Sequence, residues 1–302
     1  MGGSGFMTSI IIVSFNRLDL IKKCLAAATK APDSEIILVD NNSTDDVVGF
    51  VKTHYPKVRV IVNKKNTGFA IGNNQGMRAG KGDYLLALNT DAFLEKDAVA
   101  KLTKFAKSHP DTGVVGPKLL NPDGTLQPSA GSFPSLWTVL LIMITIDNWP
   151  FFRKFLPSIH NRYPGHFKTT RTFDWVTGAC LLIPRGVFEK TKGFDENYFM
   201  YGEEQELQYR MHELGYKSYY LPSAQAIHLG FSSSSPANGA IKELLSYIAF
   251  FKKYKPSWQI PILKTLIVSG CLLRICRGLV QTKHRWMISA YMTAIIKILY
   301  ES

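Results

Sequence analysis

Short apolar runs alternate with amphipathic stretches along the first third of the chain. The runs are rich in β-branched side chains, and in the stretches between them the apolar positions recur every three or four residues. This alternation is typical of βαβ units that build a parallel sheet between helices. It predicts an α/β fold, with strands at 9–13, 35–39, 58–62 and 84–88 and helices at 18–28, 45–55 and 70–79.

The rest of the chain is less regular. A helix is expected at 96–108 and a strand at 114–120, whereas the stretch 126–173 has weak periodicity and several prolines. Further on, the pattern predicts strands at 181–183, 219–221 and 224–227 and a helix at 203–214. Gly215 favours a C-terminal cap on that helix, and Ser43 or Thr44 is expected to cap the helix at 45–55.

Polar clusters follow the four predicted N-terminal strands. They are Ser14-Phe15-Asn16-Arg17, Asp40-Asn41-Asn42-Ser43, residues 63–68, and Asn89-Thr90-Asp91. In open parallel sheets, ligands bind beyond the carboxyl ends of the strands. We therefore expect the four clusters to converge on one crevice.

The acidic residues of these clusters suggest a metal and a nucleotide. Mg²⁺ and Mn²⁺ take oxygen ligands and are held by one or two carboxylates together with substrate phosphates, so Asp91 is a candidate ligand, although an Asn-x-Asp turn also caps helices. Asp40 can accept hydrogen bonds from a base or ribose, or serve only in a turn. The Gly- and Asn-rich segment 66–76 begins a helix and suits a nucleotide, but it contains neither GxxxxGK[ST] nor GxGxxG.

Three glutamates, Glu203, Glu204 and Glu206, stand at the start of the predicted helix at 203–214. Acids there stabilise the helix dipole, which is one explanation. A carboxylate can also act as general base toward a hydroxyl. Since adjacent helix positions point about 100° apart, only one of Glu203 and Glu204 can face a crevice. His228 is either structural or a metal ligand, and His212 is expected at the surface.

Most of the net charge of +13 lies near the C-terminus. Residues 241–302 hold ten Lys and Arg against two Glu, among many aliphatic and aromatic side chains. This composition favours an anionic membrane surface over nucleic acid, although ordinary helices with a solvated basic face would share it. Because Lys264 and Arg274 interrupt the apolar run 260–275, we expect it to lie in the interface rather than to span the bilayer. The run 136–146 is too short to cross, and it predicts a buried helix or a membrane patch.

The four cysteines, Cys24, Cys180, Cys271 and Cys276, form no CxxC pair. Their scatter argues against a disulfide framework or a cysteine zinc site, and it fits a reducing compartment on the cytosolic side. The opening Met1-Gly2-Gly3-Ser4-Gly5 has the composition of an added leader, with Met7 as the expected native start. No signal peptide is expected after it.

Seven motifs in a fixed order resemble the family 2 glycosyltransferases, and among them bacterial rhamnosyltransferases. They lie within residues 8–230 and are Ser14-Phe15-Asn16, Asp40-Asn41-Asn42-Ser43, Asn66-Thr67-Gly68-Phe69, Asn89-Thr90-Asp91, Trp175-Val176-Thr177-Gly178-Ala179, Gly193-Phe194-Asp195-Glu196 and Gly202-Glu203-Glu204. The resemblance implies a GT-A fold, in which a Rossmann-like nucleotide half continues into an acceptor half. The chain is accordingly divided into a leader at 1–6, a nucleotide-sugar-binding half at 7–125, an acceptor half at 126–235 and a basic amphipathic helical tail at 236–302.

The resemblance also implies roles for single residues. Asp40 matches the contact to base and ribose, Asn89 and Asp91 the metal-binding turn, His228 the late metal-binding histidine, and Glu204 the catalytic base. Further nucleotide contacts are implied at Ser14, Asn16, Asn42, Asn66, Gly68, Phe69 and Asn73, and contacts to the sugars at Trp175, Thr177, Gly178 and Glu203. Asn89 departs from the family's usual acid, which leaves more of the metal binding to Asp91. Glu204 stands where Asp is usual, so Glu203 or Glu206 stays an alternative base.

The implied activity is an inverting sugar transfer that depends on Mg²⁺ or Mn²⁺. dTDP-L-rhamnose is the expected donor, and a lipid-linked saccharide of a cell-wall or surface polysaccharide is the expected acceptor, at the cytoplasmic face of the membrane. No nucleic-acid partner is expected, and a homo-oligomer is left open. UDP-linked sugars stay an alternative, because no residue separates thymidine from uridine. A non-catalytic nucleotide-sugar-binding protein and a nucleotidyltransferase are the alternatives from other classes.

Overall fold

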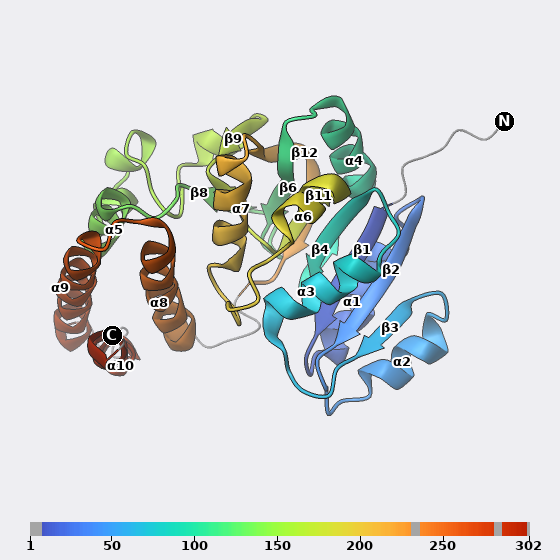
Figure 1. The fold of residues 1–302 in the computed structure, drawn as a ribbon, viewed down its shortest axis with the longest axis horizontal. Coiled ribbons are helices and arrows are strands. Elements are labelled where there is room, and N and C mark those ends of the chain that lie inside the picture. Colours follow the sequence, from blue (N-terminus) through green and yellow to red (C-terminus); the bar gives the residue numbers. More distant parts are fainter. Residues whose placement is uncertain (1–7, 231–235, 281–285, 301–302) are drawn as a thin grey trace. The chain divides into compact units, whose positions relative to one another are not determined.

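A computed structural model of the chain describes residues 8–230, 236–280 and 286–300 (Figure 1). The chain divides into two compact units. Unit 1 comprises Met1–Ala130 and Pro164–Gly230, and unit 2 comprises Gly131–Tyr163 and Phe231–Ser302. Residues 131–163 thus group with the C-terminal helices, whereas the sequence places them in a half that runs from 126 to 235. The expected leader, residues 1–6, lies outside the described residues.

Unit 1 is built on a sheet with strand order β3-β2-β1-β4-β11-β6-β12-β5, in which β7 also pairs with β6 and β9 with β12. The strands are β1 Thr8–Ser14, β2 Ser34–Asp40, β3 Arg59–Val62, β4 Tyr84–Asn89, β5 Ala92–Leu94, β6 Thr112–Leu120, β7 Leu126–Gln127, β9 Arg171–Phe173, β11 Cys180–Pro184 and β12 Lys217–His228. The short strands β8 (Ala130–Gly131) and β10 (Trp175–Val176) lie outside this sheet. Strands β1 to β4 pair in parallel, which confirms the predicted α/β class.

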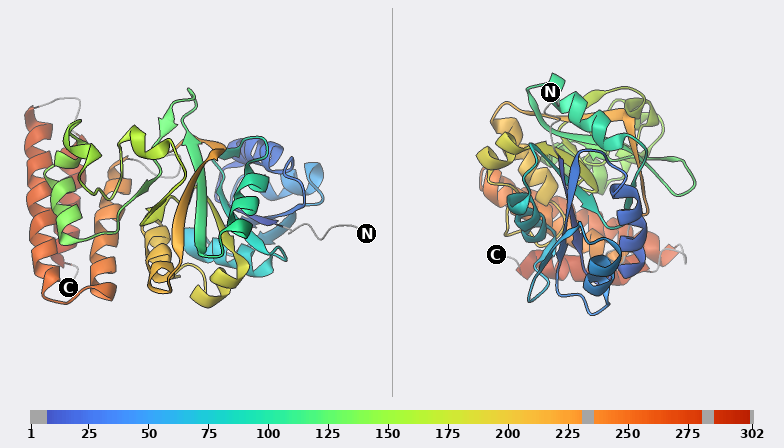
Figure 2. Two further views of the ribbon diagram at one scale, coloured as in Figure 1. Left: turned by 90° about the horizontal axis from the view of Figure 1, so that it is seen from above. Right: turned by 90° about the vertical axis from the view of Figure 1, so that its right-hand side faces the viewer.

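Helices cover both faces of this sheet (Figure 2). They are α1 Leu18–Ala28, α2 Val47–His54, α3 Gly68–Ala79, α4 Ala98–Ser108, η3 Pro164–Phe167, α6 Arg185–Thr191 and α7 Glu203–Glu213. Successive side chains of a strand point to opposite faces, so Ile10 and Ile12 of β1 pack with α1, α2 and α4, whereas Ile11 packs with α3, α6 and α7. Burial on both faces explains why the strands are apolar at nearly every position.

The register of the parallel strands sets their ends level. Ser14 of β1 pairs with Asp40 of β2, and Val13 of β1 pairs with Asn89 of β4. A slip of one residue would turn each buried row of side chains to the other face of the sheet, so the apolar pattern specifies this alignment. The polar clusters after these three strands therefore begin at one edge of the sheet.

Strand β12, Lys217–His228, joins the two strands that the pattern predicts at 219–221 and 224–227. It runs parallel to β6, and its last residues pair antiparallel with β5. The register shifts between Leu221 and Gln225, where Pro222 lacks a backbone N–H. This interruption makes the sequence read as two pieces. The continuous strand carries His228 to a position opposite Ala92, the residue after Asp91.

Helix α2 begins two residues later than predicted, and Ser43 and Thr44 do not cap it. The hydroxyl of Ser43 accepts a hydrogen bond from the backbone N–H of Asn16 (2.9 Å), and the backbone N–H of Thr44 donates to Oδ1 of Asn16 (2.6 Å). Asp45 accepts from the backbone N–H of Leu18 at the start of α1 (2.8 Å). These residues hold the loop after β1, a tertiary role that a local capping pattern does not reveal.

Unit 2 is helical. It contains α5 Leu136–Met143, η1 Ile146–Asn148, η2 Phe152–Lys154, α8 Pro236–Tyr254, α9 Gln259–Val280 and α10 Trp286–Tyr300. Helix α9 packs against α5, α8 and α10 (Figure 2). Arg274 of α9 donates to the carbonyl oxygens of Ile142 (2.6 Å) and Met143 (2.8 Å) at the C-terminus of α5, where the carbonyls lack the usual helical partners.

One helix among the described residues is long and apolar enough to cross a membrane. It covers Gln259–Leu279 of α9, 21 residues with a mean hydropathy of 1.5 over the most apolar window, of which 22% is buried. Length and composition alone are weak support for a span, because the core helix of a soluble protein passes the same test. Lys264 and Arg274, the basis for predicting an interfacial location, lie within this helix. That location stays a prediction.

Candidate functional site

The register places Ser14, Asp40 and Asn89 side by side at the ends of β1, β2 and β4. Ser14 and Asp40 are buried. Oδ2 of Asp40 accepts from the backbone N–H of Ser43 (3.1 Å), whereas Oδ1 and the Ser14 hydroxyl have no hydrogen-bond partner among the described residues. A buried polar atom without a partner costs about 1–3 kcal/mol. Both atoms are therefore suited to a ligand with complementary polar groups.

The loops after β1 and β2 turn through left-handed backbone conformations. Asn16 has φ 53° and Asn42 has φ 65°, a region that Asn tolerates better than most residues. Oδ1 of Asn16 accepts from both the backbone and the hydroxyl of Thr44 (2.6 and 3.2 Å), so this side chain joins the two loops. Asn42 is exposed at the rim.

Asn41 organises the edge of the site, a role that the sequence did not predict. Its buried amide donates to the carbonyl of Gly68 (3.0 Å), and its oxygen accepts from Asn63 (2.8 Å) and from the hydroxyl of Thr67 (2.9 Å). Asn63 also donates to Gln75 (2.8 Å). The network joins the ends of β2 and β3 to the start of α3. Asn41 and Asn63 stand at the equivalent ends of β2 and β3, and this repeated position of an amide side chain is the sequence signal that could have identified the role of Asn41.

Of the predicted nucleotide-binding residues, Asn66 precedes α3, and Gly68, Phe69 and Asn73 lie in its first turns. Oδ1 of Asn66 accepts from the backbone N–H of Gly68 (2.9 Å), and Gly68 has φ 81°, where glycine is favoured. The amide of Asn73 donates to the carbonyl of Phe69 (3.0 Å), and the backbone N–H of Phe69 donates to the carbonyl of Phe199 (2.9 Å). Asn66 and Asn73 thus hold the backbone of this turn.

Asn74, the next residue, ties α3 to the loop at 193–196 and was not predicted. Its amide donates to the carbonyl of Phe194 (2.8 Å) and to Glu196 (3.0 Å), and its oxygen accepts from the backbone N–H of Phe194 (2.9 Å). Glu196 also pairs with Arg78 (2.9 Å). The hydrogen bond from Asn74, followed by that from Arg78, holds the pKa of Glu196 below its usual value.

Asp91 and His228 face each other across the β5–β12 ladder. Nε2 of His228 lies 3.4 Å from Oδ1 of Asp91, and the two side chains are 15% and 6% exposed. A charged N–H to carboxylate hydrogen bond is shorter, about 2.7–2.9 Å. The backbone N–H of Leu229 donates to the Asp91 carbonyl (3.0 Å), which fixes the turn. Two potential ligand atoms therefore converge without a short bond between them.

The contacts of Gln127 indicate which ring nitrogen of His228 carries a proton. Its Oε1 lies 2.7 Å from Nδ1 of His228, while its Nε2 donates to Asn121 (2.9 Å) and to the carbonyl of His228 (3.1 Å). The atom that faces Nδ1 is therefore an acceptor, so Nδ1 carries the proton. Nε2, the other ring nitrogen, faces Asp91. Imidazole nitrogen beside a carboxylate is a suitable partial ligand set for a divalent cation.

A cation at this pair would take its other ligands from substrate and water. Among residues 8–230, 236–280 and 286–300, no three His, Cys, Asp or Glu side chains form a metal-binding group. Mg²⁺ is commonly bound by one or two carboxylates with substrate phosphates, so two protein ligands suffice. The nearby thiol of Cys24 donates to the Asn89 carbonyl (3.6 Å), and burial, assisted by the charge of Asp91, raises its pKa, so Cys24 stays protonated.

Gln208 fastens the acidic helix α7 to strand β10. Its amide nitrogen donates to the carbonyl of Val176 (2.7 Å), and its oxygen accepts from the backbone N–H of Val176 (2.8 Å). The same nitrogen donates to the carbonyl of Glu204, one turn earlier on the helix (2.9 Å). Gln208 was not predicted. Its spacing of four residues from Glu204 is the signal that could have found it.

Gly178 brings three predicted residues together. A Cβ added there would lie 3.3 Å from the ring of Phe69 and 3.6 Å from Cβ of Glu204. Trp175 is buried, and Thr177 is held by a backbone hydrogen bond to the segment before β8 (2.9 Å). The absence of a side chain at Gly178 therefore lets Phe69 and Glu204 approach its backbone closely.

The three glutamates of α7 have different surroundings. Glu206 is fully buried, and both of its oxygens accept from Arg210 (2.8 Å each). Arg210 also donates to the carbonyl of Gly193 (2.7 Å), so this bidentate pair is structural. Glu203 is buried, whereas Glu204 is partly exposed. Of the three residues, only Glu204 is partly exposed, although its Oε2 is buried.

Backbone contacts connect Glu204 to the turn at Asn89-Thr90-Asp91. The backbone N–H of Asn89 donates to the carbonyl of Ala179 (2.9 Å). Gly178, which precedes Ala179, borders Glu204, and Asp91 lies two residues after Asn89. Asp91 follows the end of β4, and Glu204 borders the residue before Ala179 at the start of β11, which pairs with that end.

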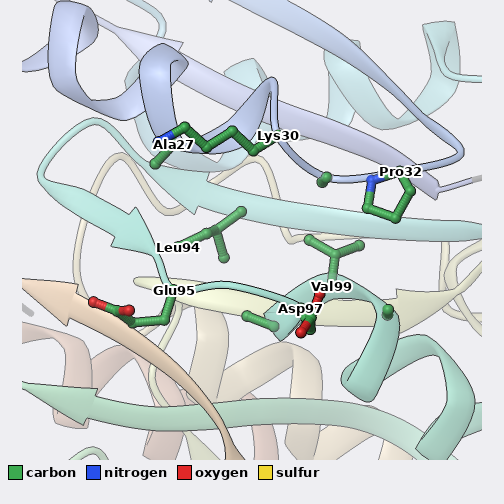
Figure 3. Close-up of a pocket in the computed structure, with 10 residues that line it drawn as sticks. Ala27, Lys30, Pro32, Leu94, Glu95, Asp97 and Val99 are labelled. Carbon is green, nitrogen blue, oxygen red and sulfur yellow. The ribbon is translucent and has the colours of Figure 1, made fainter.

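A separate pocket lies elsewhere in unit 1 (Figure 3). Its empty volume, open solvent included, is about 310 Å³, and it is lined by the end of α1, by β5 and by the start of α4, including Lys30, Glu95 and Asp97. The predicted site residues are not part of its lining. This pocket therefore contributes nothing to the site at the strand ends.

Comparison with known proteins adds independent findings. Residues 9–190 match the model of the family described as "Glycosyl transferase family 2". An N-acetylglucosaminyl-diphospho-decaprenol L-rhamnosyltransferase of Mycobacterium tuberculosis is 30% identical over 262 residues, 80% of this chain and 82% of the relative. Rhamnosyltransferase WbbL of Escherichia coli is 26% identical over 74% of this chain and 83% of its own. A mannosyltransferase from Pyrobaculum calidifontis, solved with GDP-Man and Mn²⁺, shares the fold, with a TM-score of 0.59 and 16% identity over 99% of this chain and 89% of its own.

Proposed function

Because the chain belongs to glycosyl transferase family 2 and is a glycosyltransferase of GT-A fold, we propose that it transfers L-rhamnose from dTDP-L-rhamnose to a lipid-linked saccharide. The names of the relatives from M. tuberculosis and E. coli support the sugar, and the former supports a lipid-linked acceptor. The observation that carries the proposal is the pair of Nε2 of His228 and Oδ1 of Asp91, 3.4 Å apart, at the edge that also holds Asp40.

The donor would bind along the ends of β1, β2 and β4. Oδ1 of Asp40 would accept a hydrogen bond from the nucleotide base or its ribose, with the Ser14 hydroxyl beside it, and the burial of both atoms without a partner in the described part of the chain supports this role. Asp91 and Nε2 of His228 would hold Mg²⁺ or Mn²⁺ together with the diphosphate. When bound, the cation supplies positive charge that stabilises the leaving diphosphate.

Glu204 is our candidate for the general base. Its carboxylate would take the proton of the acceptor hydroxyl while the hydroxyl oxygen attacks the anomeric carbon. The bond from that carbon to the diphosphate oxygen breaks, its electron pair leaves with the nucleoside diphosphate, and the anomeric configuration inverts. Two observations support Glu204 over its neighbours, because Glu206 is held by Arg210 and Glu203 is buried.

We place the enzyme peripherally at the cytoplasmic face of the membrane, where it would act in cell-wall or surface polysaccharide synthesis. The basic, apolar helices of unit 2 support contact with an anionic bilayer. The relative that acts on a decaprenol-linked substrate supports a membrane-bound acceptor.

A donor panel tests the proposal. The full chain is incubated with dTDP-L-rhamnose, UDP-sugars and GDP-sugars, a lipid-linked N-acetylglucosamine acceptor, and Mn²⁺ or Mg²⁺, and the released nucleotide is identified. We expect release of dTDP with dTDP-L-rhamnose. Turnover with a UDP-sugar alone would show that the donor is that sugar and not dTDP-L-rhamnose. Release of pyrophosphate would indicate a nucleotidyltransferase. Donor binding without nucleotide release would indicate a non-catalytic protein.

A further inference from the structure

Residues 148–157 of unit 2 form an exposed loop that is rich in aromatic side chains. Its sequence contains Trp149, Phe151, Phe152 and Phe155 with Arg153 and Lys154, and it has no acidic residue. The two ends of the loop are pinned, because the hydroxyl of Ser158 donates to the buried Asp147 (2.7 Å). The backbone N–H of Ser132 also donates to the Ser158 carbonyl (2.9 Å). Hydrogen bonds of the flanking residues therefore hold the loop at its base.

The aromatic side chains of the loop face outward although its backbone is ordered by hydrogen bonds. Phe151 is 73% exposed, Phe155 68% and Trp149 59%. The N–H of Arg153 donates to the carbonyl of Trp149 (2.9 Å), and the N–H of Phe155 donates to that of Phe152 (2.9 Å). The rings of Phe151 and Phe155 lie 6.1 Å apart, and both Trp149 and Phe151 contact Phe152. Contiguous exposed apolar surface of this kind marks an interaction site.

The charge of unit 2 indicates which partner covers this surface. Unit 2 contains thirteen Lys and Arg against three Asp and Glu, a net charge of +10. The two acids among its described residues are both engaged, Asp147 by Ser158 and Glu243 by His160 (2.6 Å). The surface is thus overwhelmingly cationic, and it selects an anionic partner.

The apolar part of the surface favours a bilayer over a single-stranded nucleic acid. Unit 2 also exposes the aliphatic side chains of Leu272, Leu273, Met292 and Ile296 on α9 and α10. Aliphatic side chains offer no stacking surface for bases, whereas they partition with Trp and Phe into the interface of a membrane. Lysine and arginine beside such side chains keep their charged ends at the headgroups.

We propose that the loop at 148–157 inserts into the interface of an anionic bilayer. Trp149, Phe151 and Phe155 enter the boundary between headgroups and acyl chains, and Arg153 and Lys154 contact lipid phosphates. The inference rests on the membrane association proposed above and deepens it, because it assigns the anchoring to a segment outside the C-terminal helices.

Flotation with vesicles tests the loop. The full chain and the triple variant Trp149→Ser/Phe151→Ser/Phe155→Ser are mixed with vesicles of phosphatidylcholine containing about one-third phosphatidylglycerol, or of phosphatidylcholine alone. We expect the unchanged protein to bind the anionic vesicles, and the triple variant to lose at least about tenfold in affinity. Leu214→Ser is the matched control, because Leu214 is 55% exposed but lies in unit 1, and it should bind like the unchanged protein.

The outcomes separate the two proposals. Failure of the unchanged protein to bind anionic vesicles would remove the membrane association itself. Equal binding of the unchanged protein and the triple variant would overturn the loop inference and leave the helices as the anchor. Two further results would replace the bilayer as the partner of the loop. One is a shift of the triple variant from dimer to monomer in sedimentation, and the other is loss of binding to a single-stranded oligonucleotide without loss of vesicle binding.

A label placed in the loop gives a second measurement that does not depend on affinity. In a Cys276→Ser background, which removes the exposed thiol, Phe155→Cys and Leu214→Cys are each labelled with an environment-sensitive fluorophore. On anionic vesicles the label at 155 should shift to the blue and become protected from an aqueous quencher, whereas the label at 214 should not. Equal accessibility of the two labels would overturn the insertion.

Discussion

Units 1 and 2 differ in where their polar groups are used. Unit 1 holds 23 Lys and Arg against 20 Asp and Glu, and its functional candidates converge on one edge of a sheet through level strand ends. Unit 2 has nearly the same net charge as the whole chain, and it exposes large apolar side chains on a loop and two helices. The comparison suggests that chemistry belongs to unit 1 and placement at the membrane to unit 2. Changes in one unit should then leave the property of the other intact.

The largest expected effect is on turnover, from a single change in unit 1. Glu204→Gln removes the proposed base but keeps the size of the side chain, so transfer should fall by about 10²–10⁴-fold while dTDP binding stays within a few-fold. Single-turnover kinetics and calorimetry measure the two properties. Glu213→Gln, at the exposed end of α7, is the matched control. Vesicle binding should be unchanged in both variants, and undiminished turnover in Glu204→Gln would remove the assignment.

The next effect concerns the cation and involves a residue outside the ligand pair. Gln127→Leu removes the acceptor for Nδ1 of His228, so the ring is free to rotate or to change tautomer. We expect Mn²⁺ affinity in the presence of dTDP, measured by electron paramagnetic resonance, to fall about 10–100-fold. Gln127→Glu keeps an acceptor at the same place and should bind Mn²⁺ nearly as well as the unchanged protein. Equal loss in both variants would show that Gln127 acts on the fold and not on the imidazole.

A smaller effect is expected from charge removal in unit 2. Lys252→Gln/Lys253→Gln removes two exposed cations near the end of α8. Each Lys near an anionic surface contributes about 1 kcal/mol, so removing two should lower the affinity for anionic vesicles by roughly thirtyfold. Donor hydrolysis without lipid should not change. The double variant Lys101→Gln/Lys104→Gln, on α4 of unit 1, is the control, and an equal loss of vesicle binding there would break the comparison between the units.

The sequence predicted the parallel core of unit 1 well because its signals are local. Strands buried on both faces must be apolar throughout, and the polar residues that end them are visible beside each run, so Asp40, Asn89 and Asp91 are found at their strand ends. The same logic placed α1 at its observed bounds. Periodicity, however, cannot show that Ser43 and Thr44 bond Asn16 rather than cap α2.

The residues that the sequence missed act over long separations. Gln127 contacts His228 across about a hundred positions, and Asn74 contacts Glu196 across a similar distance. Neither pair has a local pattern, since an isolated amide reads as a surface residue in any single window. The association of 131–163 with the C-terminal helices was missed for the same reason, because the pairing of α5 with α9 depends on residues far apart in the chain.

The smallest expected effect concerns the pH dependence of stability in unit 1. The pKa of Glu196 is lowered in the folded chain by its hydrogen bond from Asn74 and by Arg78. A lowered folded pKa contributes stability that is present above the unfolded pKa and is lost as the pH falls through the folded pKa. Glu196→Gln should therefore lower the free energy of unfolding at neutral pH. Because the carboxylate is 43% exposed, solvent screening limits the difference to less than about 1 kcal/mol.

Urea unfolding at pH 7 and at about pH 3 measures this difference, which should shrink as the carboxylate becomes protonated. Asp195→Asn, which removes the neighbouring charge, is the control. Asp195 raises the pKa of Glu196 and so opposes the lowering by Asn74 and Arg78. The control should not reproduce the loss at neutral pH. A difference for Glu196→Gln that is equal at both pH values would mean that the amide of Asn74, and not the charge, makes the contact. Vesicle binding should be unchanged throughout, because the loop that Glu196 closes belongs to unit 1.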